Sequence, residues 1–168
     1  MITIEMSCRS ETVSETLMGV IKLTALAHSA GIQVKLRLLD SFSGGPDGTE
    51  TDPYLLQDVV QAIADGGADV LIVQGHGNED EDDLRAHLES LLGLDVSGES
   101  MMERLGFRGN LDCTVMASKI GLTHFEAAAA GSADGTQFVT LADAATAMAD
   151  AGLSLGYLDL AAAQTLSK

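Results

Sequence analysis

Positive charge is scarce in this sequence. Its 168 residues include 9 Lys and Arg against 25 Asp and Glu, which leaves a formal net charge of −16 at pH 7. A protein that binds nucleic acid or an anionic membrane needs a cationic surface to neutralise phosphates. The composition therefore predicts a protein partner with a basic surface, and neither nucleic acid nor membrane as a partner. The composition is also compatible with a homo-oligomer.

Cysteine is nearly absent, and there is no long apolar run. Cys8 and Cys113 are the two cysteines, and neither lies in a CxxC or Cys/His spacing, which indicates reduced thiols rather than a disulfide framework or a zinc site. No segment approaches the roughly 18 apolar residues of a membrane span, and the first residues lack the pattern of a signal peptide. We therefore expect a cytoplasmic protein with no metal and no other cofactor.

Tryptophan is missing and proline occurs only twice, but glycine is frequent and 46% of the residues are hydrophobic. This composition is that of an ordinary globular protein. The length suits one domain, or a domain of about 90 residues with a second lobe. Because the pattern of apolar residues changes character from Asp95 onward, we predict an α/β domain over residues 1–94 and a C-terminal α/β extension over residues 95–168.

Strands and helices alternate in the first of these parts. Alternating apolar side chains predict strands at Ile2–Met6 and Ile32–Leu38, and the apolar run Val70–Val73 predicts a third strand. Apolar residues at helical spacing predict helices over Leu17–Ala30 and Leu84–Leu92.

Capping residues mark where helices begin. Asp52 followed by Pro53 predicts the N-cap and first position of a helix whose apolar stripe ends at Ile63. The consecutive acids from Glu79 to Asp83 predict another helix start, because negative charge is favourable near unpaired amides and the positive end of the helix dipole.

The second half has weaker patterns. They predict a short helix from Ser100 through Leu105, strands at Leu111–Met116 and Gln137–Leu141, and a helix from Leu141 to Met148. Residues 153–160 fit a strand and a helix equally well.

The order of elements resembles a known family. VLIVQGHGNEDEDDLRAHLESLL (residues 70–92) is similar to the last strand, acidic turn and closing helix of HPr, the histidine-containing phosphocarrier of the sugar phosphotransferase system. TETDPYLLQDVVQAIADGGADV (residues 49–70), and ITIEM with the helix and strand after it, are similar to the family's middle helix and opening. The resemblance covers residues 2–93 and implies an α+β fold, an HPr-like open-faced β-sandwich with helices on one face of the sheet. A single doubly wound α/β sheet is the alternative.

The family implies a phosphoryl carrier with an acceptor histidine at the start of its first helix. The equivalent loop here, SCRSETVSETL (residues 7–17), has no histidine and places Ser14 at the helix start. Members that lack the histidine serve as binding partners. Asp52 stands where the family carries a regulatory serine. The resemblance therefore favours a non-catalytic regulatory or protein-interaction module over an enzyme, with Ser14 and Asp52 among its binding residues.

A second segment, CTVMASKIGLTHFEAAAA (residues 113–130), is similar to the opening strand and histidine helix of the same family. Thr123 and Glu126 have the spacing of a capping box, which predicts His124 in the first turn of a helix. Because an imidazole is nucleophilic near neutral pH, the alternative function is an active phosphocarrier with His124 as phosphoryl acceptor.

His76 is a further candidate, because it follows a predicted strand at the edge where open α/β sheets bind ligands. With Glu79 or Asp80 it has ligand types suited to a divalent cation, although a turn histidine without a ligand is the simpler interpretation. A small α/β enzyme with His76 at a strand end is therefore the third hypothesis, and parallel strands would favour it over both others.

Overall fold

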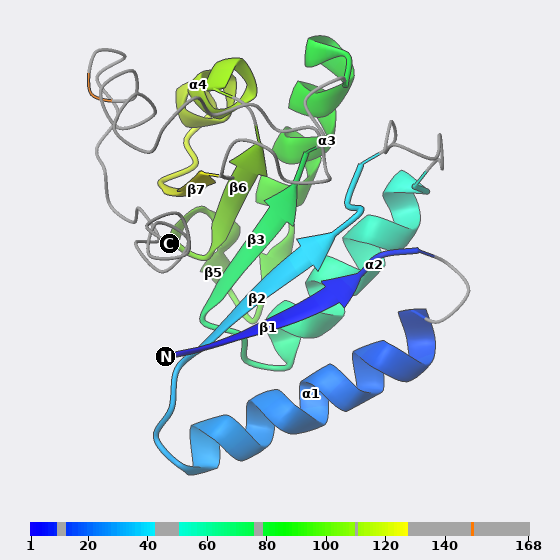
Figure 1. Cartoon of the computed structure of the whole chain (residues 1–168), viewed down its shortest axis with the longest axis vertical. Coiled ribbons are helices and arrows are strands. Elements are labelled where there is room, and N and C mark those ends of the chain that lie inside the picture. Colours follow the sequence, from blue (N-terminus) through cyan, green and yellow to red (C-terminus); the bar gives the residue numbers. More distant parts are fainter. Residues whose placement is uncertain (10–12, 43–50, 76–78, 110, 128–148, 150–168) are drawn as a thin grey trace, which may run out of the picture.

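The computed structural model describes residues 1–9, 13–42, 51–75, 79–109, 111–127 and 149. Strands and helices alternate along this part of the chain (Figure 1). The elements are β1 (Ile2–Ser7), α1 (Val13–Ser29), β2 (Val34–Leu39), α2 (Pro53–Asp65), β3 (Val70–Gln74), α3 (Glu81–Leu92), β4 (Asp95–Val96), β5 (Glu99–Ser100), the 3₁₀ helix η1 (Met101–Glu103), β6 (Leu105–Gly109), α4 (Leu111–Lys119) and β7 (His124–Ala127).

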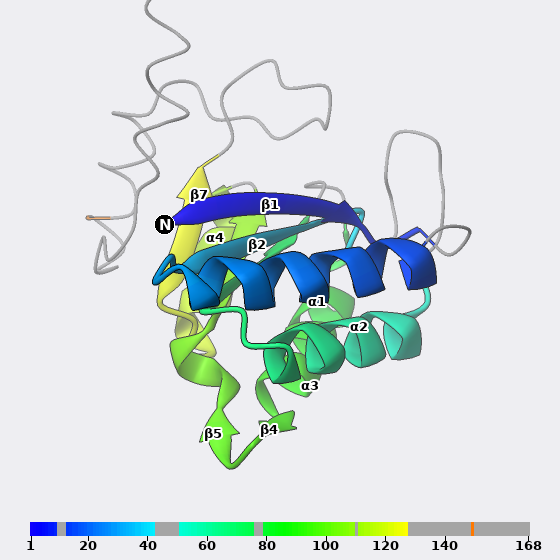
Figure 2. The ribbon, with the colours of Figure 1, turned by 90° about the horizontal axis from the view of Figure 1, so that it is seen from below.

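One five-stranded sheet organises the molecule. Its strand order is β1-β2-β3-β6-β7, and every neighbouring pair is parallel. Parallel neighbours need crossover connections, which α1, α2, α3 and α4 provide. Figure 2 shows α1, α2 and α3 on one side of the sheet, and α4 packs into the same hydrophobic core. Parallel strands in chain order, with their helices in one outer layer, are the arrangement of part of a (β/α)₈ barrel.

Both folds predicted from the sequence are wrong. The HPr-like open-faced sandwich fails because its strands would pair antiparallel, whereas all strands of this sheet are parallel. The doubly wound alternative fails because its helices would cover both faces of the sheet, whereas here they share one face (Figure 2). Periodicity identifies strands and helices in the first half, but it does not report how the strands pair.

The hydrophobic core lies between the sheet and the helices. Alternate residues of β2, β3 and β6 are fully buried there, and the apolar stripes of α2 and α3 pack against them. Burial of each such side chain contributes about 1.5–3 kcal/mol, which fixes the helix-covered face of every strand. The largest buried side chains of this layer are Met6, Leu36, Leu38, Leu56, Ile63, Leu71, Leu84, Leu88, Leu91 and Phe107.

The predicted helix caps are confirmed. Asp52 is the N-cap of α2 and its carboxylate accepts a hydrogen bond from the Tyr54 amide at 2.9 Å, with Pro53 in the first turn. Asp80 is the N-cap of α3 and accepts from the amides of Asp82 and Asp83. The acid run is therefore a helix start, and the residues from Asp80 to Asp83 are exposed.

Several elements of the second half differ from the prediction. The helix predicted from Ser100 through Leu105 is only the 3₁₀ turn η1, and Leu105 begins strand β6, which was not predicted. Leu111–Met116 was expected to be a strand but belongs to α4, whose Cys113, Met116 and Ala117 recur at helical spacing and join the core. His124 was expected at a helix start but lies in β7. Gly121 has a φ of 111° and closes the turn after α4, where the Leu122 amide donates to Ala117 O. The glycine thus ends one helix and does not begin another.

The sheet continues across the predicted boundary at residue 94, because β6 and β7 follow β3 in the same sheet. The strand predicted at Gln137–Leu141, the helix to Met148 and the ambiguous residues 153–160 lie outside the described residues. Within the described part of the chain, no helix has the length and apolar character needed to cross a membrane.

Candidate functional site

Charged side chains line the face of the sheet opposite the helices. In β2, Leu36 and Leu38 are fully buried in the core, so the alternate residues Lys35 and Arg37 point to the opposite face. Phe125 is in the core from β7, which places His124 and Glu126 on this opposite face too. We call it the open face.

Glu126 is the centre of an ion-pair network on the open face. Its Oε1 accepts a hydrogen bond from Lys35 Nζ at 2.6 Å, and its Oε2 accepts one from Arg37 Nε at 2.7 Å. The side chains of Lys35 and Glu126 are only 7% and 5% exposed. Arg37 NH1 also donates to Glu5 Oε1 on β1. The network therefore joins three strands.

This network requires a strongly curved sheet. β2 and β7 are three strand positions apart, and neighbouring strands lie about 4.7–4.9 Å apart, so a flat sheet would separate them by about 14 Å. Lys35 and Glu126 nevertheless meet. Gly106 of β6 lies between them and carries no side chain, and a Cβ at this position would lie 2.5 Å from Ile72 Cδ1 and 2.6 Å from His124 Cβ. The open face is thus concave and closely packed at its centre.

Glu126 is held in its ionised form. Burial alone would raise the pKa of this carboxyl, but hydrogen bonds and charge from Arg37 and Lys35 outweigh it and hold the pKa below its usual value. Burial likewise opposes the charge on Arg37, yet Glu126 and Glu5 raise its pKa. Glu126 is therefore a fixed anion that orients two cations, and it is a poor proton acceptor at neutral pH.

A second polar group lies where β1 and β2 end. Ser7 Oγ donates to Asp40 Oδ2 at 2.7 Å, and Arg9 Nε lies 3.1 Å from the same oxygen. Asp40 has a φ of 53°, a left-handed conformation that few residues other than glycine adopt. Thr51 Oγ1 donates to its carbonyl at 2.8 Å. These contacts hold one carboxylate and one guanidinium at the carboxyl edge of the sheet.

β3 and β6 contribute a third group to this edge. Arg108 Nη1 donates to Gln74 Oε1 at 3.4 Å, and Gln74 is only 4% exposed. The backbone N–H of Gln74 donates to Ser41 Oγ at 3.2 Å, and Ser41 Oγ donates to Leu38 O at 2.6 Å. The register places Arg108 beside Glu126 of β7. Arg108 therefore lies next to the Glu126 network.

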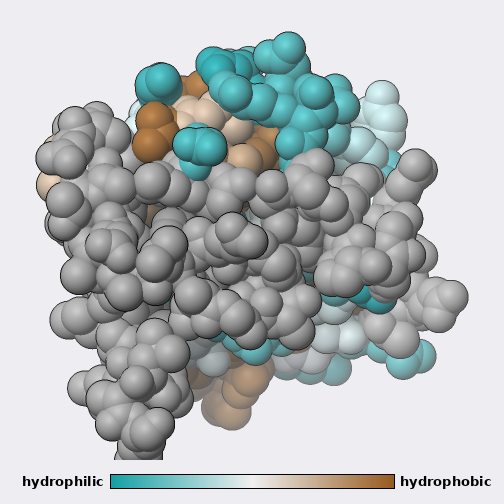
Figure 3. Space-filling view, turned by 45° about the horizontal axis from the view of Figure 1, so that its top comes forward, coloured by the Kyte–Doolittle hydropathy of each residue, from teal (hydrophilic) through white to brown (hydrophobic). Residues whose placement is uncertain are grey.

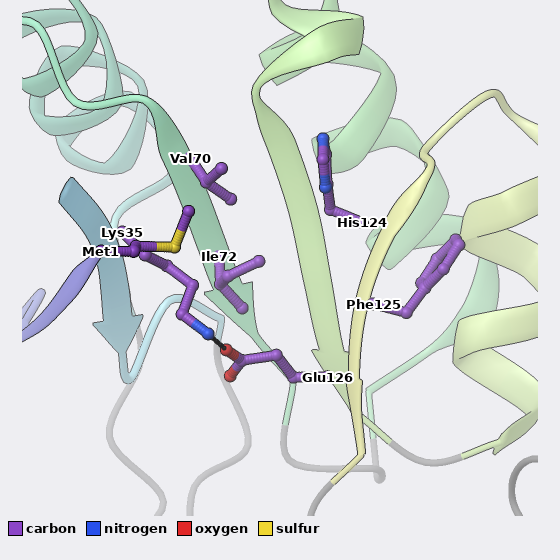
Figure 4. A pocket seen from close by; sticks show the side chains of 7 residues that line it. All are labelled: Met1, Lys35, Val70, Ile72, His124, Phe125 and Glu126. Atoms are coloured by element: carbon purple, nitrogen blue, oxygen red, sulfur yellow. Dashed lines mark hydrogen bonds and ion pairs between the residues drawn. The ribbon is translucent and has the colours of Figure 1, made fainter. Parts of the chain in front are cut away.

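A small cavity lies beside this network, with Lys35 and Glu126 pointing toward one another at its rim (Figure 4). Its volume of about 10 Å³ is room for about one water molecule. The His124 ring borders it, and its Nε2 lies 2.9 Å from Glu103 O. Because a carbonyl only accepts, Nε2 carries the hydrogen of this bond. The cavity is lined by Met1, Lys35, Val70, Ile72, His124, Phe125 and Glu126.

The residues predicted as functional are not brought together. His124 is on the open face, Ser14 is an exposed residue in the first turn of α1, and Asp52 caps α2. His76 lies outside the described residues, so the cation site predicted with Glu79 or Asp80 is not described. Among the residues that the structure describes, no group of three His, Cys, Asp or Glu side chains has the geometry of a metal site.

Sequence reasoning missed Lys35, Arg37, Arg108 and Glu126. The signal that was present is the alternation in β2, where two cations face away from the core. Glu126, the partner of both cations, is 91 residues away from Lys35 in the chain. Only the strand order of the sheet brings the two residues close. Cys8 is a weaker candidate: burial and the nearby Asp40 raise the pKa of its thiol to about 12, although a hydrogen bond with Ser41 lowers it. Cys8 is therefore a structural thiol rather than a nucleophile.

The comparisons with known proteins concern the fold. The HMG-CoA lyase from Brucella melitensis matches 98% of this chain with a TM-score of 0.74 and 17% sequence identity. The HMG-CoA lyase from Bacillus subtilis matches with a TM-score of 0.65 and 17% identity, and the hydroxymethylglutaryl-CoA lyase from Pseudomonas aeruginosa with 0.62 and 14%. No family model and no curated protein matches the chain.

These matches correct the functional hypothesis as well as the fold. An HPr-like phosphocarrier or regulatory module would have an HPr-like sandwich, whereas this chain shares the parallel α/β fold of the lyases it matches. The prediction of an HPr-like regulatory module, and its alternative with His124 as phosphoryl acceptor, are therefore wrong. The chain spans 64% of the length of the Brucella melitensis chain. At these identities the likeness establishes the fold, which is the barrel-type parallel α/β fold of these lyases.

Proposed function

We propose that this chain is a catalytic domain that binds a small anionic substrate on the open face, near the carboxyl edge of its sheet, and cleaves a carbon–carbon bond. The observation that carries the proposal is the gathering of cationic side chains there, four of them against the three carboxylates Glu5, Asp40 and Glu126. Four of the 9 Lys and Arg residues of a chain with net charge −16 lie on the open face or at this edge: Arg9, Lys35, Arg37 and Arg108. Barrel enzymes place their active sites at the carboxyl ends of the strands.

The charge pattern suits a lyase. When the bond between the α and β carbons of a 3-hydroxy acyl compound breaks, the hydroxyl group loses its proton to a base and the β carbon becomes a carbonyl carbon. The electron pair of the broken bond moves onto the acyl carbonyl oxygen, where negative charge develops. Fixed cations in a site with little water stabilise that charge more than they stabilise the neutral ground state. Arg108 has a suitable position for this role, because it projects from β6 beside Glu126 and is half-buried. A planar guanidinium also binds a substrate carboxylate through two hydrogen bonds.

Lys35 and Arg37 have a supporting role in this proposal. Both donate to Glu126, and Arg37 also donates to Glu5, so the two carboxylates offset the two positive charges. The carboxylates hold the two cations in place, and the network positions groups without attracting an anion by a net charge of its own. The named substrate of the fold neighbours, hydroxymethylglutaryl-CoA, is the first compound to test, because it contains a carboxylate and a thioester carbonyl.

The test is an assay of the whole chain with hydroxymethylglutaryl-CoA and with smaller 3-hydroxy carboxylates. Each compound is incubated with and without a divalent cation, and its loss is followed by chromatography and mass spectrometry. We expect at least one compound to be cleaved. Arg108→Ala should lower kcat/KM by about 10²-fold to 10³-fold, the usual cost of removing one group that stabilises developing negative charge.

Arg85→Ala is the matched control. Arg85 lies on α3, and its guanidinium pairs with Glu81 at 3.2 Å on the exposed surface. Its loss removes the same charge and should change kcat/KM less than twofold, since a surface pair contributes about 0–1 kcal/mol. If the folded protein consumes none of these compounds, or if Arg108→Ala behaves like Arg85→Ala, the proposal is wrong.

Figure 3 shows hydrophilic side chains gathered at the end of the molecule where α3 is labelled in Figure 1.

A further inference from the structure

Helix α1 exposes large apolar side chains on the face turned away from the core. Met18, Leu23 and Leu26 are 55%, 44% and 66% exposed, and Ile32, in the connection after the helix, is 38% exposed. They are four of the seven large hydrophobic residues that are exposed in the described part of the chain. Single apolar residues on a surface are normal, but four from one helix and the connection after it form a patch. We call these four residues the α1 patch.

None of the described elements covers this face of α1. α1 packs on β1, β2 and α2 through its buried residues, which include Val20 and Ala27. β1 is an edge strand of the sheet, and α1 runs along the outer margin of the molecule (Figure 1). The α1 patch therefore faces outward.

Gly19 is unexplained by the contacts within the chain. It lies in the interior of α1, next to Met18, and a Cβ at this position would have no atom within 4 Å. Glycine within a helix costs about 0.5–1 kcal/mol relative to alanine, and nothing inside the protein requires it here. A glycine on an outward helix face allows another backbone or a large side chain to approach closely.

The charge of α1 indicates the occupant. Two copies of a chain with net charge −16 repel each other except where the contact surface is neutral. α1 is the longest helix described and contains one acid, Glu15, and two basic residues, Lys22 and His28, of which His28 pairs with Asp69. By contrast, the first turn of α3 alone contains three acids. A basic partner would favour the acidic surfaces, whereas a second copy would favour the neutral, apolar surface of α1.

We propose that the α1 patch is a homodimer interface, occupied by the same patch of a second copy of this chain. A two-fold axis would pair each residue of one patch with a residue of the other patch, and every such contact would occur twice. Gly19 then provides the hollow into which a leucine of the second copy packs. A stable interface buries about 800 Å² on each partner, so residues flanking α1 also contribute.

The test measures the mass of the intact chain in solution by light scattering and its association constant by sedimentation. We expect a dimer at about 10–50 μM, a range typical of moderate affinity. Leu26→Glu should raise the dimer Kd at least tenfold. Tyr54→Glu is the matched control, because Tyr54 is 77% exposed on α2 and lies outside the patch. It should leave the Kd within twofold of the wild-type value.

A second variant separates association from folding. Gly19→Ala should raise the Tm of the monomeric Leu26→Glu protein, because alanine is the better helix former, and should weaken the dimer in the otherwise wild-type chain. Circular dichroism checks that each variant is folded. A wild-type chain that is monomeric at 50 μM, a Leu26→Glu protein that dimerises as tightly as wild type, or a Tyr54→Glu protein that dissociates would each overturn the proposal.

Discussion

Glu126 and Glu5 both accept hydrogen bonds from Arg37, but water reaches them to very different extents. The Glu126 side chain is 5% exposed and also pairs with Lys35, whereas the Glu5 side chain is 50% exposed. Attraction between charges is much stronger away from water, and so is the penalty for leaving one of them unpaired. The same interaction therefore has two different consequences for stability.

Replacing the buried partner should destabilise the fold. Glu126→Gln keeps the shape of the side chain but leaves the charge of Lys35 uncompensated in a buried position. We expect the free energy of unfolding to fall by about 3–5 kcal/mol, the usual cost of breaking a buried pair. Glu5→Gln is the control and should cost about 0–1 kcal/mol. Urea unfolding measures both, and equal losses for the two variants would show that the Glu126 network does not behave as a buried one.

At the scale of elements, local patterns predict β1, β2, β3, α2 and α3 well, because each has a strong periodicity and the helices have clear caps. They miss β6 and fail at α4 and β7, where a short apolar segment fits both the helical and the strand period and the capping-box spacing of Thr123 and Glu126 does not begin a helix. The polar character of the open face could be predicted from Lys35 and Arg37. The contact of these residues with Glu126 could not be predicted, because it depends on the strand order and on the curvature of the sheet.

Curvature depends on the small size of Gly106. An alanine Cβ there would lie 2.7 Å from His124 O, a backbone atom that cannot move without shifting β7. We expect Gly106→Ala to lower the free energy of unfolding by about 1–3 kcal/mol, as overpacking usually does. Gly93→Ala is the control, because Gly93 has a φ of −76° and its nearest contact would be an ordinary 3.4 Å. A Gly106→Ala protein as stable as the Gly93→Ala protein would contradict the close packing of β6 against β7.

At the scale of the molecule, stability depends on pH, and two carboxyl groups of the described residues have lowered pKa values that contribute to this. Glu126 has a lowered pKa because Arg37 and Lys35 outweigh its burial. Asp69 has a lowered pKa as well, because burial is outweighed by hydrogen bonds from the Val34 amide at 2.7 Å and from His28 Nε2 at 2.8 Å. Against this, the net charge of −16 destabilises the compact state by repulsion at neutral pH.

These two effects predict the shape of the pH profile. A carboxyl whose pKa is lower in the folded state stabilises the fold above its unfolded pKa, and this contribution is lost as the pH falls through the folded pKa. For Glu126 and Asp69 the unfolded values are 4.5 and 3.8, so the loss begins below about pH 4.5. Between pH 7 and pH 5, partial protonation of other acids and of histidines reduces the repulsion.

We therefore expect the Tm in low salt to be as high at pH 5 as at pH 7, or higher, and to fall steeply below about pH 4.5. Added salt should raise the Tm more at pH 7 than at pH 5, because it screens the larger net charge. The Glu126→Gln protein should have a lower Tm at pH 7, and its Tm should fall less steeply in acid, since it lacks one of the two carboxyl groups whose pKa is lowered in the folded state. Scanning calorimetry of both proteins from pH 7 to pH 3 checks this. If the Tm of the two proteins falls equally steeply below about pH 4.5, Glu126 does not control the loss of stability in acid.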